Sequence, residues 1–352
     1  MAAIMASVVE MTQIVSEGEW QAEWCRALGA PTWAAVIDAV LERLDTGTAA
    51  ARLLRDDEAD PHGSAVWLRL LGAVHRLVLD DPTVPLGRYF ATAGGRPDPP
   101  GVGAVFLEFV DAQSDTVAIE FARPVQTNEV ARAGALSAGM NWLGGLVHLH
   151  EVGASAGLNL WMDRFRVVAG DGAWGPDDAA VVLDGLFRDG SPPTASFVVG
   201  ERRGCDPSPL RTDDPSAMRI LRSFVWPDQP ERLRRLDAAI ATAGNVSIDA
   251  EGAAAWCARQ LDELRPGRTV VYHSIVMPYL SAAERAELAR TIADAGEHAD
   301  DEHALAWVAF EITDAGDRAE LTVRRWPEGD VTRLATLTPH GADIHWSPTR
   351  LD

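Results

Sequence analysis

The stretch Leu146-Val-His-Leu-His-Glu-Val152, followed by Gly153-Ala-Ser-Ala-Gly157, decides the fold. A short, mostly apolar run that lies between the Gly144-Gly145 pair and Gly153 is typical of a buried β-strand. Apolar residues resume at Leu158 and Leu160, as they would at the start of a helix. A strand, a turn of small residues and a helix open a βαβ unit, so this stretch predicts a parallel sheet covered by helices.

Further segments of strand length continue this pattern toward the C-terminus. They span residues 196–200, 246–248, 269–276 and 304–312, and each lies between helix-like stretches. The capping box Ser281-Ala-Ala-Glu284 marks the start of one of the intervening helices. Residues 319–323 and 331–337 flank Pro327-Glu-Gly-Asp330 and predict a hairpin. We therefore expect an α/β fold with a mostly parallel sheet and a C-terminal β-hairpin, and a second hairpin inserted near 164–195.

The first part of the chain has a helical pattern. Apolar residues recur at helical spacing around Trp20 and Trp24, from Trp33 to Leu44, and from Trp67 to Val78. Ser64 is placed to cap the last of these helices. The sequence thus predicts a helical N-terminal region at 1–125, a lid or cover, and an α/β domain at 126–352.

Composition excludes several classes of function. The formal charge of -21 repels a phosphate backbone, so nucleic acid is not expected as a partner. Every basic residue is arginine, which excludes a lysine Schiff base and a P-loop lysine. The three cysteines are far apart and no membrane span is evident, so we expect a soluble cytoplasmic protein. His148 and His150 lack a third ligand, and no metal is expected.

The turn after the first predicted strand suits a ligand. Small residues let a ligand approach the backbone, and the acidic Glu151 suits a cationic or hydroxyl-bearing group. The alternative is that Gly153 and Gly157 only allow close packing of a helix on the sheet.

Residues 151–157 resemble motif I of class I S-adenosylmethionine-dependent methyltransferases, in which an acidic residue precedes three spaced glycines. The resemblance covers residues 128–346 and implies a Rossmann-like fold. It implies S-adenosylmethionine as cofactor, bound by Glu151, Gly153, Ser155 and Gly157, with Asp206 on the ribose and Asp249 at the adenine. Ser155 replaces the middle glycine, and an insertion separates Glu151 from Asp206.

A second resemblance is to a largely actinobacterial family, domain of unknown function 2332. Four stretches carry it: residues 126–130 (Gln-Thr-Asn-Glu-Val), 151–160, 225–229 (Val-Trp-Pro-Asp-Gln) and 271–274 (Val-Tyr-His-Ser). This resemblance supplies a family and implies no activity.

Three residues are candidate catalysts, each with a structural alternative. His273 and Ser274 end a predicted strand, where His273 is either a general base or a hydrogen-bonded core histidine. Ser274 lacks the Gly-x-Ser-x-Gly context of a nucleophile elbow. Asp228 is either a catalyst or the N-cap of a helix that begins at Pro230.

Four further residues are candidates for substrate binding: Arg123, Gln126, Asn128 and Tyr279. The alternative for Asn128 is to cap a helix that runs to Trp142. The leading hypothesis is a methyltransferase that acts on a small molecule, in a homo- or hetero-oligomer or alone. The alternatives are other chemistry on the same scaffold, such as cyclisation or elimination in specialised metabolism, and a non-catalytic binding or partner subunit.

Overall fold

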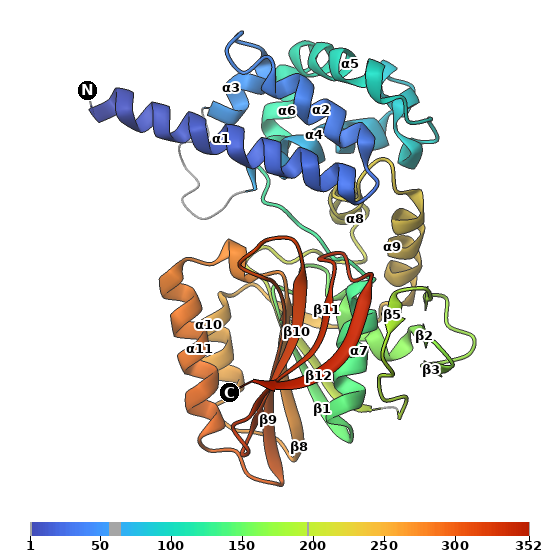
Figure 1. The fold of residues 1–352 in the computed structure, drawn as a ribbon, viewed down its shortest axis with the longest axis vertical. Coiled ribbons are helices and arrows are strands. Elements are labelled where there is room, and N and C mark those ends of the chain that lie inside the picture. The colour runs from blue at the N-terminus through green and yellow to red at the C-terminus, as the bar shows by residue number, and fades with distance from the viewer. Residues whose placement is uncertain (1, 56–64, 196, 352) are drawn as a thin grey trace. The chain divides into compact units, whose positions relative to one another are not determined.

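The structure is a computed structural model that describes residues 2–55, 65–195 and 197–351 (Figure 1). Its internal contacts group the chain into two compact units. Unit 1 comprises Met1–Thr127 and Asp213–Arg234, and unit 2 comprises Asn128–Thr212 and Arg235–Asp352. The chain therefore contributes two separate segments to each unit.

Unit 1 is helical. Its helices are α1 (Ala2–Ala27), α2 (Pro31–Leu41), α3 (Ala49–Arg55), α4 (Val66–Asp80), α5 (Pro99–Ala112), α6 (Ser114–Phe121), α8 (Pro215–Ser223) and the first residues of α9 (Pro230–Thr242), with short 3₁₀ segments at Pro85–Tyr89 and Ala91–Ala93. The stripes from Trp33 to Leu44 and from Trp67 to Val78 are mostly buried, and Trp33 packs edge-on against Phe90 and Phe106. Around Trp20 and Trp24 the stripe is less buried, because Trp20 is 47% exposed. The predicted N-terminal helices are therefore confirmed, whereas Ser64 lies outside the described residues.

Hydrogen bonds join the two segments of unit 1. The buried His75 ring bonds the Ser223 carbonyl through Nδ1 at 2.9 Å and the Thr92 hydroxyl through Nε2 at 2.7 Å. A carbonyl only accepts, so Nδ1 carries the proton and Thr92 donates to Nε2. Burial lowers the pKa of His75 to about 4, because a charged ring would be desolvated there. A side chain at Gly72 would meet the Phe224 ring at 2.7 Å.

Unit 2 is built on a nine-stranded sheet in the order β5-β12-β11-β10-β9-β8-β1-β6-β7. The strands are β1 (Leu146–Val152), β5 (Phe187–Asp189), β6 (Val198–Cys205), β7 (Ser247–Asp249), β8 (Gly267–Ser274), β9 (His303–Ile312), β10 (Ala319–Trp326), β11 (Val331–Leu337) and β12 (Ile344–Leu351). Strands β7, β6, β1, β8 and β9 are parallel, and β9 to β12 form an antiparallel meander. The α/β class and a large, mostly parallel sheet are confirmed, and the meander extends the predicted hairpin by one strand.

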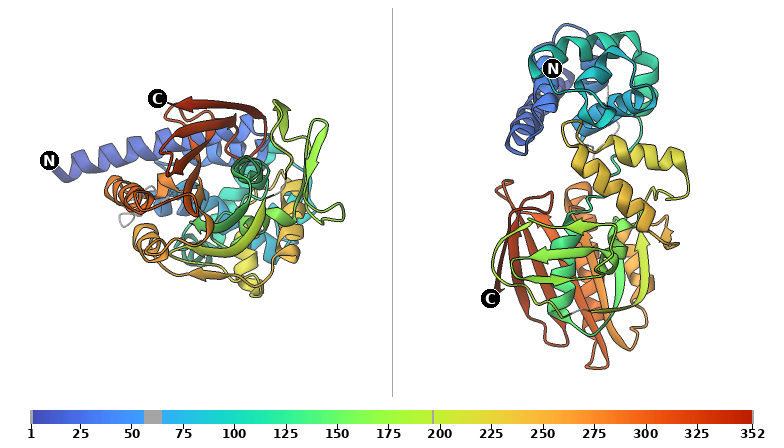
Figure 2. Two further views of the ribbon diagram at one scale, coloured as in Figure 1. Left: turned by 90° about the horizontal axis from the view of Figure 1, so that it is seen from below. Right: turned by 90° about the vertical axis from the view of Figure 1, so that its right-hand side faces the viewer.

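Helices cover both faces of this sheet (Figures 1 and 2). Helix α7 (Arg132–Leu143) packs on one face, and α10 (Ala253–Gln260) and α11 (Ala282–Gly296) pack on the other. Helix α11 begins with the predicted capping box, in which Ser281 and Glu284 bond each other's backbone. The opposite placement of these helices is typical of a doubly wound fold.

The helix expected after β1 is absent from the described chain. Residues Leu158–Arg164 form a 3₁₀ segment, η3, which is kinked at Trp161. Its residues Leu158–Met162 are all buried, so they offer no polar face of the kind that an amphipathic α-helix needs. A three-stranded sheet follows, in the order β3-β2-β4, from β2 (Arg166–Ala169), β3 (Gly172–Trp174) and β4 (Val182–Leu183). Strands β2 and β3 form an antiparallel hairpin within the predicted insertion.

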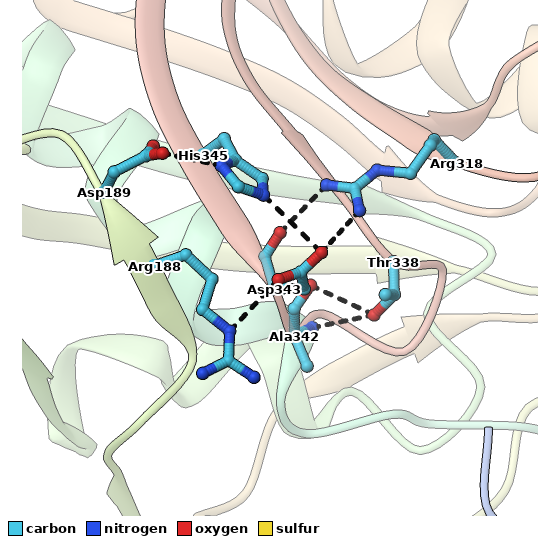
Figure 3. A network of polar contacts seen from close by, with 7 residues as sticks. All are labelled: Arg188, Asp189, Arg318, Thr338, Ala342, Asp343 and His345. Carbon is cyan, nitrogen blue, oxygen red and sulfur yellow. Dashed lines mark hydrogen bonds and ion pairs between the residues drawn. The ribbon is translucent and has the colours of Figure 1, made fainter. Parts of the chain in front are cut away.

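A polar network fixes one edge of the large sheet (Figure 3). The Asp343 carboxylate accepts from Arg188 at 3.1 Å and from Arg318 at 2.5 Å, and these ion pairs lower its pKa. His345 on β12 contacts Asp189 on β5 through Nδ1 at 2.8 Å. The network therefore helps to hold the short strand β5 against β12, because the backbone pairing between these two strands is short.

Candidate functional site

The strand order locates a candidate site in unit 2. Numbered along the chain, the five parallel strands have the order 3-2-1-4-5, which reverses direction between β1 and β8. In open α/β sheets, ligands bind outside the carboxyl ends of the strands at such a reversal. The residues there are the turn 153–157 after β1 and the segment 275–279 after β8.

The turn after β1 is held by two side chains from distant parts of the sequence. Asp206 accepts hydrogen bonds from the Ser155 amide at 3.0 Å and from the Ser208 amide at 2.8 Å. Asn128 accepts from the Leu158 amide at 3.0 Å. Ser155 itself has a φ of +53°, a left-handed conformation that is uncommon for residues other than glycine. Asn128 therefore does not cap α7, which begins at Arg132, and the capping alternative is wrong.

The glycines of this turn allow close packing of neighbouring segments of the chain. A Cβ atom at Gly153 would lie 2.5 Å from Cγ2 of Val276, and one at Gly157 would lie 2.9 Å from Cδ1 of Ile248. Both glycines also have φ values near +70°. Their side-chain positions are thus occupied by the protein itself, as in the packing alternative, although the packed groups are the segment after β8 and strand β7 and not a helix.

The segment after β8 is fixed by a relay of hydrogen bonds. Trp307 donates to Nε2 of His273 at 3.0 Å, and Nδ1 of His273 lies 2.6 Å from Glu311. Because an indole N–H only donates, Nε2 is the acceptor and Nδ1 carries the proton toward Glu311. The same Glu311 oxygen accepts from the Val276 amide at 2.8 Å, next to Ile275 with its φ of +55°. His273 is fully buried, and both its ring nitrogens are used, as expected of the core-histidine alternative.

His273 is therefore expected to contribute to stability. In His273→Asn the shorter side chain cannot reach Trp307 and Glu311 together, so one buried polar group loses its partner. We expect a loss of about 2 kcal/mol, visible as a lower melting temperature. His298→Asn is the control, because His298 is exposed on the same unit, and it should change stability by less than about 0.5 kcal/mol. Equal melting temperatures for both variants would contradict the relay.

Glu151, the penultimate residue of β1, pairs with Tyr272 of β8, so the two side chains lie on the same face of the sheet. Both are almost completely buried, at 2% and 0% exposure. Burial raises the pKa of Glu151 well above its usual value, opposed by the adjacent Tyr272 hydroxyl and reinforced by the charge of Asp206. Among the described residues, neither Oε2 of Glu151 nor the Tyr272 hydroxyl has a hydrogen-bond partner.

The remaining predicted residues of unit 2 are at the same end of the sheet. Ser274 ends β8, and its carbonyl accepts from Arg132 at 2.9 Å. Tyr279 follows in the 3₁₀ segment Met277–Tyr279 and is 37% exposed. Asp249 ends β7 and accepts from Trp256 at 2.8 Å and from Arg259 at 3.0 Å. The Arg259 and Trp256 donors lower the pKa of Asp249 despite its partial burial.

Three predicted residues belong to unit 1. Arg123 pairs with Glu120 at 2.8 Å, and Gln126 is buried. Asp228 accepts from the Thr32 amide and hydroxyl at 3.2 and 2.5 Å, at the start of α2. Its carboxylate thus satisfies the N-terminus of α2 and not that of α9, so the N-cap alternative named the wrong helix. The contacts described for Arg123 and Asp228 are therefore contacts within unit 1.

Two negative observations apply to the described part of the chain. No group of three or more His, Cys, Asp or Glu side chains there is placed to hold a metal ion. None of its helices combines the length and the apolar character that crossing a bilayer requires.

Sequence reasoning missed Tyr272 and Glu311 as site residues, together with Asp163 and Arg202, which lie near Tyr272. Tyr272 had a usable signal, because side chains alternate along a strand and His273 and Tyr272 must face opposite ways. Glu311 had none, since its partners His273 and Val276 come from another strand.

Comparisons with known proteins identify the family. Neither the curated proteins nor the solved structures give a match. A family model described as "Uncharacterized protein conserved in bacteria (DUF2332)" matches residues 16–346. This span includes the turn after β1, the His273 relay and Glu151. The chain therefore belongs to the DUF2332 family of proteins conserved in bacteria.

Proposed function

We propose that this protein is an S-adenosylmethionine-dependent, methyltransferase-like protein that acts on a small molecule. The observation that carries the proposal is Glu151, a buried carboxyl group at the reversal point of a 3-2-1-4-5 sheet with an unpartnered oxygen. Such a group needs a hydrogen-bond donor from a ligand or water to offset its burial. The acidic residue of motif I has this place in the methyltransferases that the sequence resembles.

The fit to the cofactor is uneven among the six candidate positions. Glu151 can accept a donor through Oε2, whereas Asp206 and Asp249 already accept from protein groups. Each carboxylate oxygen has a second lone pair, so both aspartates retain acceptor capacity. S-adenosylmethionine would supply an activated methyl group, and the chain would align the acceptor with it. Glu151 would hold a donor group, and Asp206 would keep the turn after β1 in shape.

A second candidate function keeps the fold without this cofactor, either for other chemistry or for a binding or partner subunit. Val276 and Ile248 favour it, because they fill the space beside Gly153 and Gly157. The 3₁₀ segment after the turn also lacks the regular helix N-terminus that commonly binds anionic groups.

Calorimetry with S-adenosylmethionine separates these candidates. We expect saturable binding to the wild type and at least about tenfold weaker binding to Glu151→Gln, equivalent to about 1.4 kcal/mol. Glu287→Gln is the matched control, because Glu287 is exposed on α11 of the same unit. Absence of binding to the wild type at millimolar ligand would end the methyltransferase proposal and leave the second candidate.

Three further statements remain predictions from the sequence: a cytoplasmic location, an actinobacterial source and assembly into an oligomer. The acidic composition continues to favour a small-molecule partner over nucleic acid.

A further inference from the structure

A set of buried polar side chains lies between the sheet and η3, on the α7 face. We call it the η3 cluster: Glu151, Asn159, Trp161, Asp163, Arg202 and Tyr272. Pairing of β1 with β8 and with β6 puts Glu151, Tyr272 and Arg202 on one face of the sheet. Burial and Glu151 raise the pKa of Tyr272, and Arg202 and Asp163 also act on it, so these groups lie within electrostatic range of its hydroxyl. All six residues belong to unit 2.

The η3 cluster combines burial with unsatisfied hydrogen bonding. Glu151, Asn159, Trp161 and Tyr272 are each less than a tenth exposed. Five atoms have no hydrogen-bond partner among the described residues: Oε2 of Glu151, Oδ1 of Asn159, Nε1 of Trp161, Oδ1 of Asp163 and the Tyr272 hydroxyl. Native structures contain only a few such atoms per hundred residues, and each calls for a water, an ion or a ligand.

Arg202 makes no hydrogen bond to any of these five atoms, and its two hydrogen bonds go elsewhere. It donates to the Leu160 carbonyl at 2.9 Å and to the other oxygen of Asp163 at 2.5 Å. Its plane also lies 4.5 Å from the centre of the Trp161 ring. The unsatisfied atoms that remain are mostly acceptors, and two belong to carboxyl groups. A matching ligand must therefore bring hydrogen-bond donors.

We propose that the η3 cluster binds the primary ammonium group of a small-molecule substrate. An ammonium group has three N–H donors, which match the acceptors of Glu151, Asp163 and Tyr272. Asp163 and Tyr272 lie outside the positions that the methyltransferase resemblance assigns to the cofactor, and Oε2 of Glu151 has two lone pairs, so it can accept from both an ammonium and a cofactor donor. Assignment of the ammonium to the substrate rests on the proposed function, whereas binding of an ammonium group does not.

The exposure of the cluster residues supplies a direction of approach. The Asp163 side chain is 26% exposed, although its Oδ1 atom is buried, whereas Glu151 and Tyr272 are almost completely enclosed. A ligand would thus meet Asp163 first and Glu151 last. Coulomb attraction to Asp163 would strengthen as water is excluded along this path, and the arriving ammonium would favour the ionised form of Glu151, whose pKa burial raises.

The test uses n-butylammonium chloride on the full chain, with butan-1-ol as the uncharged probe of equal length. Both are followed by thermal shift and by NMR titration at constant ionic strength. We expect saturable binding of butylammonium below about 50 mM and none of butanol. Asp163→Asn should weaken binding about tenfold or more. Tyr272→Phe removes an unpartnered oxygen, so it should fold normally and weaken binding about threefold.

Several outcomes would overturn the proposal. They are equal responses to the amine and the alcohol, no saturable amine binding, or amine binding unchanged in folded Tyr272→Phe together with Asp163→Asn. A crystal structure grown with the amine that shows only ordered water among these side chains would do the same. Failure of S-adenosylmethionine to bind while butylammonium still binds would remove the methyltransferase proposal alone and keep the ammonium site.

Discussion

Gly153→Val is expected to destabilise unit 2 by about 3–5 kcal/mol. This loss is the sum of two free-energy costs: the strain of a left-handed backbone at a β-branched residue, and the clash of the new side chain in a packed turn. Gly153 has a φ of +67°, and its added Cβ would lie 2.5 Å from Cγ2 of Val276. The loss would appear as a lower melting temperature and a lower midpoint of urea unfolding. The primary effect is thus on folding, whether or not a ligand approaches this turn.

A double-mutant cycle separates the clash from the backbone strain. Gly153→Ala is measured in the wild type and in Val276→Ala, which removes both Cγ atoms that would contact the new Cβ. In the second background the cost should fall to the backbone strain alone, about 1–2 kcal/mol. Additive costs would show that the turns after β1 and β8 are not in contact in solution.

Acid is expected to remove a stabilising contribution of His75. Its pKa is about 4 in the folded chain and near 6.5 in the unfolded chain. At pH values between these two, the unfolded chain therefore binds the proton more readily than the folded chain does. The contribution is fully present above the unfolded pKa and is lost as the pH falls through the folded pKa. At about 1.4 kcal/mol per unit of pKa, the loss amounts to about 3 kcal/mol.

His75→Asn isolates this contribution. Its amide can still donate to the Ser223 carbonyl, as Nδ1 of His75 does, but it does not titrate. The wild type should be the more stable protein at pH 7.5, and its advantage should shrink by about 3 kcal/mol by pH 4. Other groups, including Glu151, titrate alike in both proteins and cancel in the difference. A pH-independent difference would show that His75 is not buried as described.

Local pattern was sufficient for most elements of the parallel sheet. Strand β1 occupies the predicted residues 146–152, because glycines bound its apolar run on both sides. The apolar runs of strands β8 and β9 and the capping box at Ser281 could also be recognised from the local sequence alone. Strand β6 was predicted too short, since it continues through the charged residues Glu201, Arg202 and Arg203. Arg202 bonds Asp163 and Glu201 pairs with Arg265, both outside the strand. Ser196, where that prediction began, lies outside the described residues.

The side-chain partners in the site could not be read in this way, because they join residues remote in sequence. Asn128 bonds Leu158, Asp206 bonds Ser155, and Asp228 bonds Thr32. From its neighbours in the sequence alone, each of these three side chains was predicted to bind a ligand or to cap a helix. The 3₁₀ segment η3 was missed because Leu158 and Leu160 fit a helix start, whereas burial of every residue from 158 to 162 depends on the fold around them. Sequence thus locates the strand ends, and only tertiary structure assigns their hydrogen bonds.

The two-segment construction of unit 1 has a consequence for synthesis on the ribosome. Its first segment ends at Thr127, and Asp213–Arg234 emerges only after residues 128–212 have been made. At about 5–20 residues per second this interval lasts roughly 4–17 s. During it the nascent helices lack the Ser223 carbonyl for His75 and the Phe224 ring beside Gly72, so apolar surface stays open to other chains. Translation speed and holdase chaperones should therefore govern the yield of this protein more strongly than its final stability does.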